Sequence, residues 1–216
     1  MTLFDPSLTI AAALADRLLL QHPFYRRWER GEVSVTELAA YAAQYRHFET
    51  YLPRFLTDLT AALPDGAAKT LVAANLADEL GDPVPHLELF ERFAAAVGAG
   101  HQPRSAATAN LLGTYDKLLA DGPLTALAGF VAYESQASDI ARTKAEGLRR
   151  HHGLDDHEVS FWQHHADVDE QHAAWARSAL GELNSMPETT GRAVRRAADA
   201  WWAFLDEREA AAAVVS

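Results

Sequence analysis

The stretch "FWQHHADVDEQHAAW" (residues 161–175) combines metal-binding side chains with the pattern of a buried helix. At about 100° per residue, His165, Asp169 and His172 fall within an arc of roughly 60°. The apolar side chains of Phe161, Trp162, Val168, Ala176 and Leu180 lie on or beside the same arc. Burying one carboxylate and two imidazoles costs several kcal/mol unless a partner compensates. A bound metal ion is one such partner, and a His–Asp hydrogen bond inside the core is the alternative.

Two glutamates also interrupt apolar faces. Glu134 lies on a stripe formed by Leu127, Phe130, Val131, Ala141 and Leu148. Glu79 shares a face with Ala68, Val72 and Leu76, and His86 follows it by seven residues across a predicted helix break. One segment can therefore present Glu79 and His86 to a single point. A lone glutamate on such a face is more often salt-bridged or snorkelling than ligating, so the argument depends on the whole set.

The charges of this set favour two metal ions. Two divalent ions carry +4, and three buried carboxylates supply −3, which leaves the site nearly neutral. Three imidazoles complete a mixed nitrogen and oxygen set of the kind that non-haem iron and manganese accept, with positions open for dioxygen or substrate. The predicted ligands are Glu79, His86, Glu134, His165, Asp169 and His172. Asp78 points away from the face of Glu79, and His164, Asp167 and Glu170 point away from the His165, Asp169 and His172 face; we expect these last three neighbours at solvated positions.

Composition limits the class of protein. The chain has 216 residues, 19 Lys plus Arg and 30 Asp plus Glu, and a net charge of −11, which argues against nucleic acid or an anionic membrane surface as partners. No stretch approaches the roughly 18 apolar residues of a membrane span, and "MTLFDPSL" does not resemble a signal peptide. The absence of cysteine excludes disulfides, thiolate metal sites and a cysteine nucleophile. We expect a cytoplasmic protein.

The elements that must position the candidate ligands are helices. Alanine is abundant and alternating Val/Thr-rich runs are missing, so we predict one all-α domain over residues 1–216, a compact bundle of seven or eight helices. Ser34 to Glu37 reads as a capping box, and Gly31 and Gly81 as helix ends. The expected helical ranges are 5–21, a short piece at 22–31, 34–63, 65–80, 86–97, 104–120, 123–151, 155–183 and 187–211.

The spacing Glu79-x6-His86, Glu134, His165-x3-Asp169-x2-His172 resembles the ligand set of the haem-oxygenase-like di-metal oxidases. The resemblance is closest to the branch that contains the chlamydial death-domain-associating protein and its bacterial relatives. It extends from about His22 to Trp175 and includes "HPFYRRW", "AAQYRHF", "NLADELGDPVPH" and "YESQ…IARTKAEGL". It implies an all-α haem-oxygenase-like (TenA/PqqC-like) fold in which Glu134 bridges two iron ions, or one iron and one manganese. It also implies that the protein uses dioxygen and an external reductant for oxidation, desaturation or C–C cleavage. We further expect a homodimer.

This branch includes para-aminobenzoate synthases that supply folate synthesis, in which a tyrosine of the protein provides the ring and a lysine is implicated as the amino donor. The matching positions are Tyr25 and Lys144, and Tyr41 and Tyr133 match further tyrosines near that site. Phe161 departs from the pattern, because the chlamydial member is expected to have tyrosine there. Tyr25 as a packing residue and Lys144 as a snorkelling surface lysine are the alternatives.

Other functions of related folds are less compatible with the sequence. The thiaminase-like relatives need a cysteine, and ferritin-like bundles use Glu-x-x-His pairs, which this chain lacks. For a haem oxygenase the only candidate axial ligand is His22, and haem would leave the six predicted ligands unexplained. An oxidase acting on an external small molecule, such as an amino acid or a fatty acid, is the main enzymatic alternative. A non-enzymatic interaction protein with a vestigial metal site is the third possibility.

Overall fold

The computed structural model describes residues 6–81, 84–183 and 185–215, with the backbone alone at 168–173 and 212–215. Within those ranges all regular secondary structure is helical, as the sequence predicts, with nine α-helices and one short 3₁₀ helix. The elements are α1 (Pro6–Leu14), η1 (Leu19–Gln21), α2 (Pro23–Arg30), α3 (Val35–Ala62), α4 (Ala67–Leu80), α5 (His86–Ala96), α6 (Ala106–Ala120), α7 (Pro123–His152), α8 (Ser160–Glu182) and α9 (Pro187–Val215).

Local signals account for most of the helix ends. The Ser34 hydroxyl accepts from the Glu37 amide, and the Glu37 carboxylate accepts from the Ser34 amide, so the predicted capping box opens α3. Gly31 ends α2 with a φ of 73°, in the left-handed region that glycine adopts without strain. These caps satisfy backbone groups that a helix end would otherwise leave without partners.

The first predicted helix, 5–21, is wrong as a continuous element. It ends at Leu14, and the chain resumes helical geometry only in η1. The amide of Leu19 donates to the side-chain oxygen of Gln136 on α7, at 2.8 Å, instead of to a carbonyl of its own helix. This contact between distant parts of the chain buries Leu19, and it replaces the local hydrogen bond that would have continued the helix.

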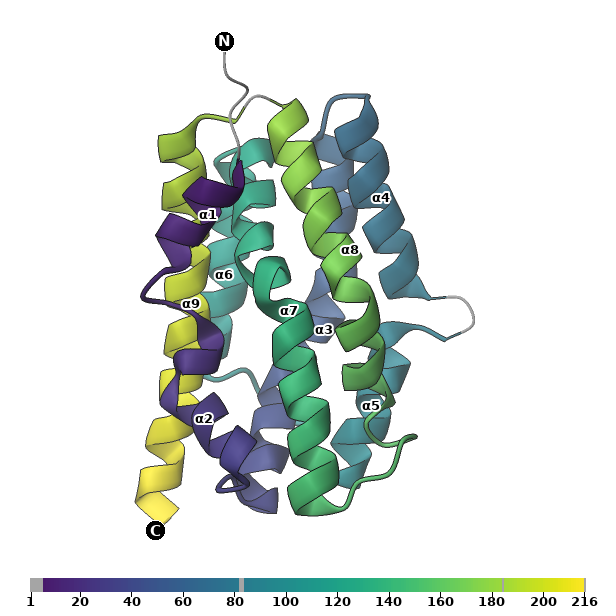
Figure 1. The fold of residues 1–216 in the computed structure, drawn as a ribbon, viewed down its shortest axis with the longest axis vertical. Helices are drawn as coiled ribbons and strands as arrows, with labels where there is room; N and C mark the ends of the chain where they lie inside the picture. Colours follow the sequence, from purple (N-terminus) through teal and green to yellow (C-terminus); the bar gives the residue numbers. More distant parts are fainter. Residues whose placement is uncertain (1–5, 82–83, 184, 216) are drawn as a thin grey trace.

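Helix α7 runs through the front of the bundle in Figure 1, with α8 along one side, α9 along the other and α3 behind it. Helices α4 and α5 pack against both α3 and α8. The elements that carry the predicted ligands, α4, α5, α7 and α8, are therefore neighbours in space. Both of the glutamate-bearing stripes face inward, since Val72 and Ala68 on α4 and Phe130 and Leu148 on α7 are buried.

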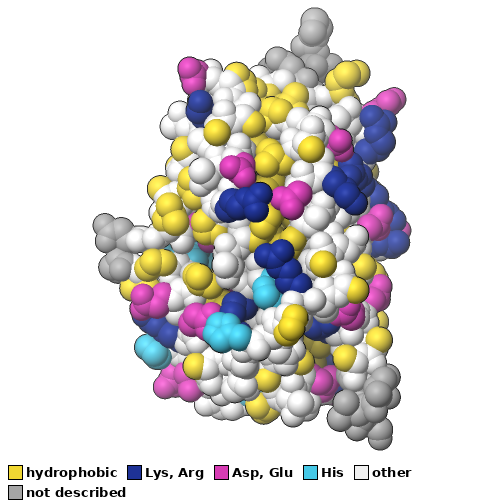
Figure 2. Space-filling model, turned by 180° about the vertical axis from the view of Figure 1, so that it is seen from behind, with side chains coloured by type: hydrophobic (Ala, Val, Ile, Leu, Met, Phe, Trp, Pro, Cys, Tyr) yellow, Lys and Arg dark blue, Asp and Glu magenta, His cyan; other side chains and the backbone are white. Residues whose placement is uncertain are grey.

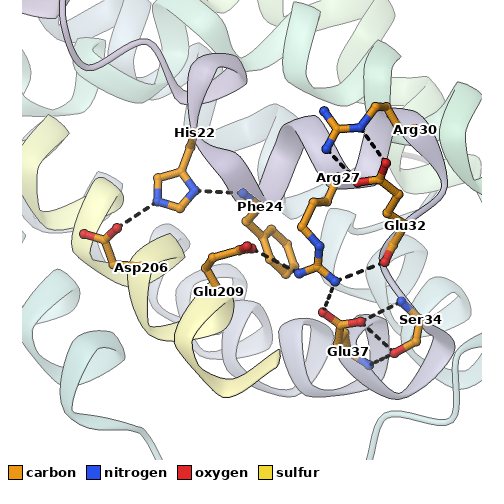
Figure 3. Close-up of polar contacts among 9 residues, drawn as sticks. All are labelled: His22, Phe24, Arg27, Arg30, Glu32, Ser34, Glu37, Asp206 and Glu209. Carbon is orange, nitrogen blue, oxygen red and sulfur yellow. Dashed lines mark hydrogen bonds and ion pairs between the residues drawn. The ribbon is translucent and has the colours of Figure 1, made fainter. Parts of the chain in front are cut away.

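A polar cluster fastens α2 to α3 and α9 (Figure 3). Arg27 donates to Glu37 at 2.7 Å and to Glu209 at 3.1 Å. His22, which is fully buried, accepts from the Phe24 amide through Nδ1, so the proton of the neutral ring lies on Nε2 and is donated to Asp206 at 3.0 Å. His22 thus caps α2 and contacts α9 with its two nitrogens. Both nitrogens are engaged, which removes it as an axial haem ligand.

Outside the core, the described helices carry charge pairs one turn apart. Examples are Arg54–Asp58 on α3 and Arg92–Glu88 on α5. Over the face in Figure 2, basic and acidic side chains are interspersed with hydrophobic ones. None of the described helices has an apolar run long enough to cross a bilayer.

Candidate active site

Glu79 and His86 meet across the turn between α4 and α5. His86 opens α5 and is 2% exposed, and its Nδ1 lies 3.0 Å from Oε2 of Glu79, which is also buried. Gly81 makes the turn possible, with a φ of 67° and so little room that a Cβ would overlap the backbone of Val84. Any other residue here would be strained and would push the two ligand-bearing helices apart.

Helix α8 brings His165 to the same point. Its ring centroid lies 4.7 Å from that of His86. Its Nδ1 is 2.9 Å from the carbonyl oxygen of Phe161, which can only accept, so Nδ1 carries the proton. The lone pair of the neutral ring is therefore on Nε2, the arrangement that fixes the orientation of metal-ligating histidines. One ligand atom each from Glu79, His86 and His165 lie within 4.8 Å of one another.

Glu134 enters from α7 and is buried on the predicted stripe. One turn further along, the Ser138 hydroxyl donates to the carbonyl of Ala166 at 2.9 Å, which sets the register of the antiparallel helices α7 and α8. This register places Glu134 level with the α8 backbone near residue 170. Burial, together with the negative charge of Glu134, raises the pKa of Tyr115. The Glu134 carboxylate therefore lies inside the bundle, within electrostatic reach of Tyr115 on α6.

The donor set fits a metal ion. One carboxylate and two imidazoles offer the mixed oxygen and nitrogen ligands that iron and manganese bind, with Glu79 and His86 buried and His165 partly exposed. The remaining predicted ligands, Asp169 and His172, lie outside the residues whose side chains the structure describes. Their role, and that of Glu134 as the bridging ligand, stays a prediction.

Two residues expected to point away from the predicted ligands lie beside this group instead. Oδ2 of Asp78 is 3.7 Å from Nε2 of His86 and 3.9 Å from Nε2 of His164. The expectation for Asp78 and His164 was wrong, because each was judged from its own helix while α4, α5 and α8 converge here. Asp167 is exposed as expected, and the side chain of Glu170 lies outside those the structure describes.

Tyr25, Tyr41 and Lys144 form a second buried cluster. The hydroxyls of Tyr25 and Tyr41 are 2.9 Å apart, and Nζ of Lys144 donates to the Tyr41 hydroxyl at 2.7 Å. Lys144 is 1% exposed, so it is not a snorkelling surface residue. Its Nζ atom lies 3.9 Å from the centroid of the Trp162 ring and 4.8 Å from that of Tyr25. Aromatic faces at these distances stabilise a buried cation.

Close packing of α2 on α7 keeps Lys144 inside. The indole nitrogen of Trp28 donates to the Lys144 carbonyl at 3.3 Å. A Cβ at Gly147 would come within 2.8 Å of the Trp28 ring, so only glycine allows this approach. Helix α2 carries both Trp28 and Tyr25, and the same contact therefore positions Tyr25 near Lys144.

A second pair of phenols adjoins this cluster. The hydroxyls of Tyr133 and Tyr45 are 2.8 Å apart, and the rings of Tyr45 and Tyr41 stack at 5.4 Å. Burial raises the pKa of Tyr25, Tyr41 and Tyr45 well above the ordinary value, so all three are protonated at neutral pH. Tyr45 was not singled out from the sequence, although its position four residues after Tyr41 puts both on one face of α3.

Phe161 and Trp162 lie between the metal-ligand group and the tyrosines. Phe161 packs 4.2 Å from the ring of His165 and 4.6 Å from Trp162, which in turn contacts Lys144. Packed aromatic rings thus connect the two clusters. At the position of the expected tyrosine, Phe161 supplies a ring without a hydroxyl.

A helical bundle that brings one carboxylate and two imidazoles together, two of these three side chains buried, has the features of a non-haem metal protein. The chain belongs to the family of iron-containing redox enzymes, whose model matches residues 39–205. It is 33% identical to a 4-aminobenzoate synthase of Nitrosomonas europaea, over 91% of this chain and 88% of that protein. It is 28% identical to a 4-aminobenzoate synthase of Chlamydia muridarum, over 90% and 86%. A haem-oxygenase-like domain of unknown function from Shewanella denitrificans has the same fold, with a TM-score of 0.79, 16% identity and coverage of 97% and 92%.

Proposed function

We propose that this enzyme is a dioxygen-dependent, non-haem dinuclear metal oxidase that makes 4-aminobenzoate from its own Tyr25, with Lys144 as the amino donor. The observation that carries the proposal is the position of the Lys144 amine, 4.8 Å from the centre of the Tyr25 ring and sealed from solvent. The names of two relatives that cover most of the chain support it.

The chemistry of the product matches a tyrosine side chain. Both have a benzene ring with two substituents in para positions. The Cα–Cβ bond of Tyr25 would break, and dioxygen would oxidise Cβ to the carboxylate carbon. At the ring, the nitrogen of Lys144 would replace the phenol oxygen, which leaves as water, and the Cε–N bond of Lys144 would break with Cε oxidised to an aldehyde. A metal pair held by Glu79, His86, Glu134, His165, Asp169 and His172 would supply oxidising power from dioxygen and a reductant, as two iron ions or as iron with manganese.

The chain's own residues have separate tasks in this proposal. Tyr41 accepts a hydrogen bond from Lys144 and exchanges one with Tyr25, so it orients both reacting groups. The raised pKa of Tyr25 keeps its phenol protonated until oxidation, and the hydrogen bond with Tyr41 holds its hydroxyl in place. Trp28 and Trp162 exclude water around the Lys144 amine.

The test uses isotopes in the whole chain. Protein carrying ¹³C-tyrosine and ¹⁵N-lysine is loaded with iron and manganese and exposed to air and a reductant, and the released small molecules are measured by mass spectrometry. We expect ¹³C,¹⁵N-labelled 4-aminobenzoate, at no more than about one equivalent per chain because each chain has one Tyr25. Tyr25→Phe removes the phenol with little change in volume and should abolish the product. Tyr51→Phe, a buried tyrosine bonded to Asp116, is the matched control.

The variants and labels separate the two reacting groups. Lys144→Arg keeps the charge but is a poor source of a transferable amine, and it should also stop product formation. A product with a ¹³C-labelled ring and unlabelled nitrogen would contradict Lys144 as the amino donor and would still support Tyr25 as the source of the ring. A metal-loaded protein that consumes dioxygen without releasing labelled aromatic amine would refute the use of Tyr25. It would instead favour an oxidase with an external substrate.

A further inference from the structure

A second group of possible ligands adjoins the first and shares His86 with it. One ligand atom each from Asp78, His86 and His164 lie within 4.8 Å of one another. Oδ2 of Asp78 is 3.7 Å from Nε2 of His86 and 3.9 Å from Nε2 of His164, and the two imidazole centroids are 4.6 Å apart. Metal–ligand bonds of about 2 Å place neighbouring ligand atoms roughly 3–4 Å apart. The observed spacing therefore suits one metal ion.

This outer group is more open to solvent than the Glu79–His86 pair of the buried centre. The side chains of Asp78 and His164 are each 36% exposed, whereas those of Glu79 and His86 are 6% and 2% exposed. Nevertheless, the Oδ2 atom of Asp78 and the Nε2 atom of His164 are shielded from solvent. Other atoms of these two side chains are therefore exposed to water, while Oδ2 of Asp78 and Nε2 of His164 face the interior.

His86 belongs to both groups through its two ring nitrogens. Nδ1 lies 3.0 Å from Glu79, and Nε2 lies 3.7 Å from Asp78. A neutral imidazole has one nitrogen with a lone pair and one with a proton. When Nε2 binds an ion in the outer group, the Nδ1 proton faces Glu79. When Nδ1 binds an ion in the buried group, the Nε2 proton faces Asp78. A carboxylate is therefore in place to accept the imidazole proton in either state.

We propose that Asp78, His86 and His164 form an entry site for divalent first-row metal ions, which hands each ion to the buried group of Glu79, His86 and His165. The inference rests on the proposed function for the buried centre and adds a route into it. Transfer exchanges ligands without oxidation or reduction. Asp78 and His164 are replaced by Glu79 and His165, and the imidazole proton of His86 moves from one nitrogen to the other. Since His86 serves one group at a time, the outer ion is transient.

The entry site is tested by the rate of Mn²⁺ uptake. Full-length apoprotein is mixed with MnCl₂, and the loss of the electron paramagnetic resonance signal of the free aqua ion is followed in time. Asp78→Asn and His164→Gln should each lower the initial rate about tenfold, the effect that loss of one group around a metal typically has on its affinity. The variant with both changes should take up Mn²⁺ no more slowly than the slower of the two single variants, because Asp78 and His164 serve one site. Asp167→Asn and His157→Gln, exposed residues of the same types, are the matched controls.

A second measurement isolates the outer ion at equilibrium. Glu79→Gln disables the buried group and should leave weak Mn²⁺ binding, which adding Asp78→Asn abolishes. Wild-type uptake rates in both Asp78→Asn and His164→Gln would overturn the entry site. The entry site would also be overturned if a folded Glu79→Gln chain bound Mn²⁺ equally well with and without the added Asp78→Asn change. A wild type that holds only the Asp78-dependent ion would instead contradict the buried centre and the transfer to it, and would leave only the metal binding by Asp78, His86 and His164 standing.

Discussion

Replacing Tyr41 with phenylalanine should disturb the tyrosine–lysine cluster more than the same change at either neighbouring tyrosine. The Tyr41 hydroxyl accepts from Lys144 at 2.7 Å and is hydrogen-bonded to Tyr25 at 2.9 Å. The hydroxyls of Tyr25 and Tyr45 each have one such phenol partner, at 2.9 and 2.8 Å. Tyr41→Phe therefore removes two buried hydrogen bonds, and Tyr25→Phe or Tyr45→Phe removes one.

The size of the effect follows from the kind of bond. A buried hydrogen bond between neutral groups contributes about 0.5–1.5 kcal/mol, and one to a charged group about 1.5–3 kcal/mol. Tyr41→Phe should thus lower the free energy of unfolding by about 2–4 kcal/mol, whereas Tyr25→Phe and Tyr45→Phe should lower it by about 1 kcal/mol. With a urea dependence of about 3 kcal/mol per molar, the unfolding midpoint of Tyr41→Phe should fall by about 1 M.

The assay is equilibrium unfolding of the four metal-free proteins in urea, followed by circular dichroism at one pH. Metal-free protein is used so that altered metal binding does not contribute to the measured stability. Equal midpoints for Tyr41→Phe and Tyr25→Phe would refute the reasoning, because the Lys144 bond would then add nothing. A variant whose unfolding free energy depends on urea with a different slope has an altered denatured or native state. The midpoints are then compared only among the variants that keep the wild-type slope.

Two further predictions concern the ligands and pH. His165→Ala and Glu134→Ala should lose most of the approximately two transition-metal ions that reconstituted wild type should hold, measured by elemental analysis; full metal content in either variant would contradict the buried centre. Burial lowers the pKa of His22 in the folded protein below its ordinary value of about 6.5. At pH values between the two, the unfolded chain binds more protons than the folded one, so the free energy of unfolding should fall as the pH falls. Urea midpoints from pH 7 to 5 should fall less steeply in His22→Gln, and an unchanged slope would show that His22 does not contribute.

The parts of the fold that depend on neighbouring residues could be predicted from the sequence. The capping box at Ser34 and the left-handed Gly31 act within one helical turn, so their residue types are sufficient to identify them. The break after Leu14 was missed because it depends on Gln136, 117 residues away along the chain from Leu19. Apolar periodicity cannot indicate a hydrogen-bond partner on another helix.

The same distinction holds for the candidate site. Burial of Glu79 and Glu134 could be predicted because each interrupts an apolar stripe on its own helix. The environment of Asp78 and His164 could not, since it arises where three helices converge. Lys144 was ambiguous on its helical wheel, at the edge of the inward stripe. Its burial depends on how closely Trp28 approaches Gly147, a packing contact between α2 and α7.

The complete burial of Tyr25 affects the lifetime of the protein as well as its chemistry. The ring is 1% exposed and packs against Phe24, Trp28 and Tyr41. Loss of a large aromatic side chain from a core typically costs about 3–5 kcal/mol, because the cavity is only partly filled by relaxation. If Tyr25 is the source of the ring, each spent chain keeps a void of that kind beside α2. Spent molecules would open more often and expose cleavable segments to proteases, so a cell could clear them selectively while fresh copies persist.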